Sequence, residues 1–140
     1  MISVSRLDIA DADTILEGAK NKALEIGVPM CIAITDESGN LIAFNRMNGG
    51  KVTSISIAQD KAYTAAAAKK NTHDYGIIAQ PGMPAYGIDT EVGGRLSIVG
   101  GGMLIEIDGQ VIGGIGVSSG TPAQDMEVAQ AGINYFMGIK

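Results

Sequence analysis

The stretch Gly100–Thr121, GGGMLIEIDGQVIGGIGVSSGT, decides how the rest of the chain is interpreted. Its apolar runs MLIEI and QVIGGIGVS predict two strands. The Asp108-Gly109 pair between them is a strong hairpin signal, because a type I′ turn needs positive φ at both central positions. The stretch is also rich in glycine, which either cradles a phosphate or lets another element pack closely.

The glycines do not match a nucleotide-binding motif. A dinucleotide fingerprint needs G-x-G-x-x-G between a strand and a helix. Here Gly114 and Gly116 are followed by Ser118, Ser119 and Gly120, which gives the wrong spacing, and no G-x-x-x-x-G-K-[ST] occurs. We therefore expect no nucleotide site of either kind.

Side chains alternate across a strand, so the glycines of QVIGGIGVS gather on one face. One face is expected to carry Val111, Gly113, Ile115 and Val117, and the other Ile112, Gly114, Gly116 and Ser118. The second face is nearly bare, and glycine in a strand often marks the close approach of another body. That body is a helix or a neighbouring subunit in one interpretation and a flat ligand in the other. The alanine-rich stretch before Lys70 would suit such a surface.

The remaining elements follow from apolar spacing and from start and stop signals. Helices are predicted over 9–26, with Asp8 as the cap, over 54–70, in a short segment capped by Thr72, and from Pro122 onward. The last helix has Thr121 as its N-cap and Gln124 to complete a capping box. Strands are predicted over 29–35, 41–47, 95–99, 103–107 and 110–118.

This element order, α-β-β-α-α-β-β-β-α, indicates an α+β fold. Short hairpin links make the sheet antiparallel, and helices at the beginning, middle and end are available to cover it. With 140 residues and no linker or repeat, residues 1–140 are expected to form a single domain.

Composition narrows the function classes. A net charge of −5 disfavours nucleic acid as a partner. No apolar run approaches the roughly 20 residues that span a bilayer, so no membrane is expected. The lone Cys31 and the absence of a secretion signal predict a cytoplasmic protein. An apolar fraction of 46% beside 18% charged residues predicts a homo-oligomer.

Three stretches together resemble the GlcG/HbpS-like family: DKAYTAAAAKK, QPGMPAYGI and GGRLSIVGGGMLIEIDGQVIGGIGVSSGTPAQD. That family includes haem-interacting proteins and the C-terminal domain of PduO-type corrinoid adenosyltransferases. The resemblance implies a profilin-like fold, with a five-stranded antiparallel sheet and helices on both faces, assembled as dimers to octamers. It also implies haem or a corrinoid as the ligand.

The candidate ligand-binding residues lie in five places. His73 is the only imidazole and thus the only histidine able to hold haem iron, and Tyr86 lies in the proline-glycine loop. Lys61 is a cation for an acidic ligand. The backbone of two loops completes the set: Gly100, Gly101 and Gly102, and Ser118, Ser119 and Gly120. For the second loop the alternative is that the helix cap already uses its donors.

Two functions follow. The first is a small-molecule-binding protein for haem or a related tetrapyrrole in a catabolic pathway. The second is an enzyme or accessory subunit acting on a small carbonyl or carboxylate metabolite. No Ser-His-Asp order or paired-carboxylate motif marks a catalytic centre.

Overall fold

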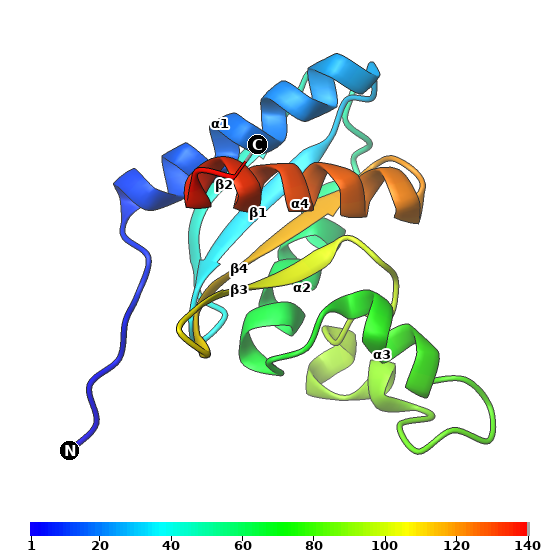
Figure 1. Cartoon of the computed structure of the whole chain (residues 1–140). Helices are drawn as coiled ribbons and strands as arrows, with labels where there is room; N and C mark the ends of the chain where they lie inside the picture. Colours follow the sequence, from blue (N-terminus) through cyan, green and yellow to red (C-terminus); the bar gives the residue numbers. More distant parts are fainter. Residues whose placement is uncertain (140) are drawn as a thin grey trace.

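The computed structural model describes residues 1–139, and Figure 1 shows their arrangement. The helices are α1 (Ile9–Ile26), α2 (Ser54–Ala67), α3 (Thr72–Ile78) and α4 (Pro122–Met137), with short 3-10 turns η1 (Ile88–Thr90) and η2 (Val92–Gly94). The strands are β1 (Cys31–Asp36), β2 (Leu41–Arg46), β3 (Gly102–Ile107) and β4 (Gln110–Ser118).

Within residues 1–139 the strands form one four-stranded sheet in the order β2-β1-β4-β3. Every neighbouring pair is antiparallel. Helices α1 and α4 lie side by side on one face, and α2 crosses the other (Figure 1). The predicted α+β class is confirmed, whereas the likeness to profilin stays a prediction.

The predicted fifth strand, over 95–99, is wrong. The Ser97 N–H donates to Thr64 Oγ1 at 2.9 Å, and the same oxygen lies 3.1 Å from the Arg95 carbonyl. A side chain of α2 therefore takes backbone groups that a strand would offer to a neighbouring strand. The segment crosses α2 as an irregular strap and does not join the sheet.

Local signals placed most helix ends correctly. Asp8 caps α1 and Gly27 ends it with φ +72°, while Thr121 and Gln124 form the predicted capping box of α4. Two details are wrong. Helix α2 ends at Ala67, before Lys70, and the N-cap of α3 is Asn71 instead of Thr72.

The bare face of β4 packs against α2. A Cβ on Gly116 would collide with the Ala58 carbonyl oxygen, and one on Gly114 would lie 2.6 Å from that of Ala62. The main chains of β4 and α2 thus approach each other closely where the strand has glycine and the helix has alanine. The packing interpretation is confirmed, and this part of the strand offers no open floor to a ligand.

One residue of β4 lies away from the predicted face. Ile112 belongs to the core that includes Ile15 and Ile115. The cause is a bulge: Ile105 pairs with Gly113 and Glu106 with Val111, so Ile112 is an extra residue and the alternation breaks there.

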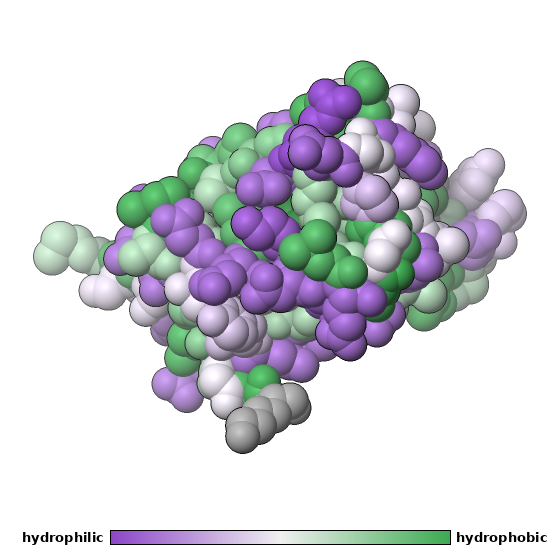
Figure 2. Space-filling view, turned by 90° about the horizontal axis from the view of Figure 1, so that it is seen from above, coloured by the Kyte–Doolittle hydropathy of each residue, from purple (hydrophilic) through white to green (hydrophobic). Residues whose placement is uncertain are grey.

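The main core fills the space between the sheet and the α1–α4 pair, and a smaller cluster under α2 holds Cys31, Ala33, Ala58 and Ala62. Seen from above, the surface mixes hydrophilic side chains with separate apolar ones (Figure 2). Among residues 1–139, no helix has both the length and the apolar character needed to cross a membrane.

Candidate functional site

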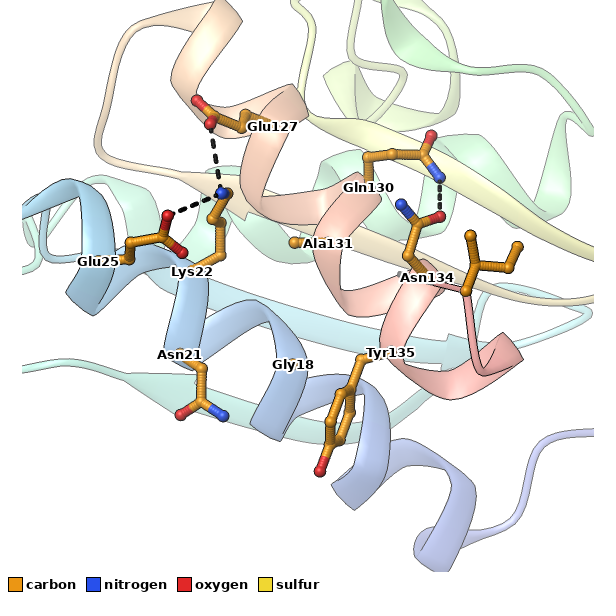
Figure 3. A pocket seen from close by; sticks show the side chains of 10 residues that line it. Gly18, Asn21, Lys22, Glu25, Glu127, Gln130, Ala131, Asn134 and Tyr135 are labelled. Atoms are coloured by element: carbon orange, nitrogen blue, oxygen red, sulfur yellow. Dashed lines mark hydrogen bonds and ion pairs between the residues drawn. The ribbon is translucent and has the colours of Figure 1, made fainter.

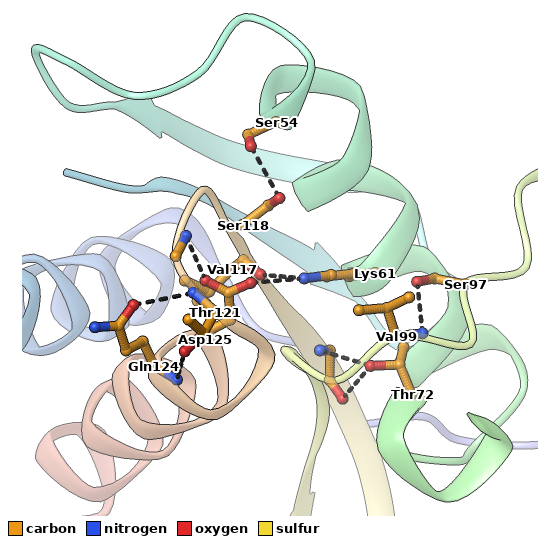
Figure 4. Close-up of polar contacts among 12 residues, drawn as sticks. Ser54, Lys61, Thr72, Ser97, Val99, Val117, Ser118, Thr121, Gln124 and Asp125 are labelled. Carbon is orange, nitrogen blue, oxygen red and sulfur yellow. Dashed lines mark hydrogen bonds and ion pairs between the residues drawn. The ribbon is translucent and has the colours of Figure 1, made fainter. Parts of the chain in front are cut away.

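Lys61 lies in the middle of α2 and is fully buried. Its side chain is 2% exposed, and Nζ donates to the Val117 carbonyl at 2.9 Å and to Asp125 Oδ2 at 2.9 Å (Figure 4). A buried ammonium group requires such partners, since an unpaired charge in a protein interior is costly. Lys61 is thus part of an internal ion pair and not a solvated surface cation.

Asp125 holds the other half of this pair at the start of α4. Its Oδ1 accepts the Gly120 N–H at 2.9 Å, so one carboxylate binds both the loop before the helix and the lysine of α2. A helix N-terminus favours a negative charge, and here the chain supplies its own. A ligand anion would have to displace Asp125 to reach the Gly120 N–H.

The two serines of the same loop are also engaged within the chain. Ser118 Oγ donates to Ser54 Oγ at 2.9 Å, and Ser119 Oγ accepts the Lys51 N–H at 3.0 Å. These bonds fasten the end of β4 to the start of α2. Binding of a ligand by either hydroxyl stays a prediction.

The triple glycine allows the buried pair to form. Gly101 has φ +128°, and a Cβ there would lie 2.8 Å from Lys61 Nζ. A Cβ on Gly100 would lie 2.7 Å from Met126 Sδ, and one on Gly102 would lie 2.5 Å from Thr72 Cγ2. All three backbones are therefore covered by side chains, and a ligand role for them stays a prediction.

A surface groove runs over the ion pair, and we call it the Lys61 groove. It has a volume of about 400 Å³, and its lining includes Lys61, Ser118 and Gly120. At the rim, Arg95 Nε donates to Asp60 Oδ1 at 3.1 Å, and the guanidinium lies 3.9 Å from the centre of the Tyr63 ring. The structure thus brings three of the predicted site residues together beside two ion pairs.

His73 and Tyr86 do not line this groove. The His73 side chain is 30% exposed on α3, with Nε2 3.7 Å from Asp74 Oδ1. Its Nδ1 is buried and has no hydrogen-bond partner within residues 1–139. Tyr86 lies in the loop after α3 and is 69% exposed. No group of three or more histidine, cysteine, aspartate or glutamate side chains in the described chain could hold a metal ion.

Sequence reasoning missed the partners in this site. The sequence analysis assigned no partner to Lys61, and it did not connect Asp60 with Arg95. The signal was present in the resemblance, because Asp60-Lys61 and Gln124-Asp125 both belong to the stretches that carry it. Spacing alone could not pair residues so far apart in the chain.

Cys31 is buried in β1. Burial raises the pKa of its thiol, although the nearby Arg46 opposes this shift. A thiol that resists ionisation is a poor nucleophile, so Cys31 has a packing role.

Comparisons with known proteins complete this description. The model of a family described as "Haem degrading protein HbpS-like" matches residues 7–134. An uncharacterised 15.0 kDa protein from the dhaT-dhaS intergenic region of Citrobacter freundii is 36% identical over 133 residues, which cover 95% of this chain and 94% of that protein.

Two further relatives concern PduO. The corrinoid adenosyltransferase PduO of Salmonella typhimurium is 35% identical over 127 residues, and the match covers 91% of this chain but 38% of PduO. The solved structure of a PduOC:heme complex is 34% identical, with a TM-score of 0.89 over 93% of this chain and 94% of that one.

Proposed function

The chain belongs to the HbpS-like family, and from this premise we propose that it binds haem with His73 as the axial ligand of the iron. The observation that carries the proposal is the relation to PduOC, whose solved structure is a haem complex. Haem, when bound, supplies an iron centre whose reactivity the axial ligand tunes.

The residues around His73 fit such a ligand. An orphaned buried nitrogen in a native structure signals a missing partner, and His73 Nδ1 is such an atom. An imidazole that ligates a metal commonly donates its other N–H to a carboxylate. Asp74 Oδ1 lies 3.7 Å from Nε2, so it would have to move closer to accept such a bond. The side chain is 30% exposed but Nδ1 itself is buried, so iron could bond to Nδ1 only after the ring turns toward the surface.

Helix α3, the loops after it and the strap also carry exposed apolar side chains that a macrocycle could cover. Ile77 follows His73 by four residues, so the two share one face of α3. The loops after α3 expose Met83, Tyr86 and Val92, and the strap exposes Val99. The predicted homo-oligomer, a dimer to octamer, stays a prediction.

The test is a hemin titration followed by the Soret band. Wild type should give a saturable, shifted band, and His73→Ala should weaken binding at least tenfold. Tyr86→Phe, which removes only the phenol oxygen, should bind as wild type does. No saturable shift in wild type would contradict the proposal, and loss in Tyr86→Phe alone would transfer the ligand role to Tyr86.

The Lys61 groove favours a second candidate function, an enzyme or accessory subunit for a small carbonyl or carboxylate metabolite. The buried ammonium of Lys61 makes two hydrogen bonds within the chain, and an ammonium group has three donors. The proposed ligand oxygen would accept from the third, in the groove that Lys61 lines with Ser118 and Gly120. Turnover or saturable binding of such a metabolite, absent in the double variant Lys61→Met, Asp125→Leu that leaves no buried charge, would support this function.

A further inference from the structure

A hollow lies where the C-terminal end of α1 meets the end of β2, and we call it the α1–β2 hollow. It has a volume of about 520 Å³. Much of its wall is apolar, with Leu24, Val28, Pro29 and Met47 among the lining residues. Leu24 is 63% exposed, so this part of the wall is open to solvent. The floor is fixed, since the Met47 N–H donates to the Met30 carbonyl at 2.9 Å.

Two cations also line this hollow. Lys20 comes from α1 and Arg46 from the end of β2, and no carboxylate is among the lining residues. Neither cation forms an ion pair within residues 1–139. The chain has a net charge of −5, but the charge of the residues that line this hollow is positive.

The neighbouring surfaces lack this combination. In the groove between α1 and α4, Lys22 Nζ lies 3.2 Å from Glu25 Oε1 and 3.7 Å from Glu127 Oε1 (Figure 3). That groove has more carboxylates than cations, and its lysine is already paired. In the Lys61 groove both cations are paired as well. An anion would find free cationic groups in the α1–β2 hollow.

We propose that the α1–β2 hollow binds an aliphatic carboxylate of the fatty-acid type. Its hydrocarbon chain would cover Leu24, Val28 and Met47, and its carboxylate would pair with Arg46 and Lys20. Arginine suits this task because its guanidinium matches a carboxylate with two parallel hydrogen bonds. A small inorganic anion would bind less well than a fatty acid, because it has no apolar surface to bury against this wall. The site goes beyond the haem function, since His73 does not line it.

The test uses decanoate, below its micelle concentration, with the full-length wild-type protein and calorimetric titration. Decanoate should bind saturably, and decanol and acetate should each bind at least tenfold more weakly, because one lacks the charge and the other the chain. Arg46→Glu and Lys20→Glu should each weaken decanoate binding at least tenfold. Lys69→Glu makes the same charge change at an exposed lysine outside the hollow and should bind as wild type does.

Amide chemical-shift mapping needs only the wild-type protein, so its result does not depend on whether the variants fold. Shifts that cluster at Leu24, Val28 and Met47 on addition of decanoate to wild type would support the proposal. The absence of saturable binding, shifts centred elsewhere, or undiminished affinity in both Glu variants would overturn it.

Discussion

The ion pair of Lys61 and Asp125 connects three parts of the chain that are far apart in the sequence. Lys61 belongs to α2, its second acceptor is the carbonyl of Val117 at the end of β4, and Asp125 opens α4. Gly101 leaves room for the ammonium group. The glycine-rich stretch and the two charged residues are therefore parts of one arrangement.

Removal of one member of this pair should be strongly destabilising. Lys61→Met leaves the carboxylate of Asp125 buried without its cation, so the free energy of unfolding should fall by about 3–5 kcal/mol. The double variant Lys61→Met, Asp125→Leu should recover most of that loss, because it leaves no buried charge. Urea denaturation of the single and double variants checks both values. A single variant within about 1 kcal/mol of wild type would contradict the buried pair.

The N-terminal segment provides a pH-dependent contact. Arg6 Nε donates to Glu37 Oε2 at 2.8 Å, and this hydrogen bond is the main reason that the pKa of Glu37 falls from 4.5 to about 2. A carboxylate with a lowered pKa stabilises the fold above its unfolded pKa, and the contribution disappears as the pH falls toward the folded value.

We therefore expect the urea midpoint of Arg6→Ala to lie below that of wild type at neutral pH. The difference should shrink as the pH falls from about 4.5 to about 2, the range between the two pKa values of Glu37. Because the pair is on the surface, the difference should be small throughout. A gap between the two midpoints that widens toward low pH would contradict this assignment.

Whether the partner of a side chain could be predicted depends on how far apart the two residues are in the sequence. Thr121 and Gln124 are three residues apart, and their capping box was predicted from that spacing. Lys61 was chosen as a site residue, but its partner Asp125 is 64 residues away. No local rule joins the two. They meet at the end of β4 because α2 packs on one face of the sheet and α4 on the other.

At the scale of elements, the approach of α2 to β4 depends on absent side chains. Gly116 meets the main chain of α2 at Ala58 and Ala62, and neither backbone can move aside as a flexible side chain would. The alanine-rich edge of the helix and the glycine face of the strand therefore form one contact that excludes both solvent and ligand.

Gly116→Ala should lower the free energy of unfolding by about 3 kcal/mol or more, at the upper end of overpacking costs. Gly109→Ala is the matched control, because Gly109 has φ +78° with nothing within 4 Å of its added Cβ. It should lose about 1–2 kcal/mol from backbone strain alone. Thermal or urea unfolding separates the two. Equal or smaller loss in Gly116→Ala would mean that the strand and helix are not in close contact.

Element boundaries were predictable where the signal was local. Asp108 and Gly109 have φ of +51° and +78°, as the predicted type I′ turn requires. The segment 95–99 has the apolar pattern of a strand, but a strand also needs a partner, and Thr64 of α2 binds its backbone first. The bulge that moves Ile112 arises from pairing with β3 and has no signature in β4 alone.

On the scale of the whole molecule, the fold separates its candidate ligand surfaces. The Lys61 groove lies between α2, the strap and the start of α4, and His73 lies on α3. The α1–β2 hollow is lined by residues of other elements, on α1 and at the end of β2. The sequence alone could predict single candidate residues for these surfaces. It could not predict which residues share a surface, because that depends on how the helices and the sheet pack.

The most direct test of the haem function is a crystal structure of the hemin-loaded protein. We predict one haem per chain on the α3 side, with a nitrogen of His73 bonded to the iron. A haem bound elsewhere, with His73 free, would contradict the account.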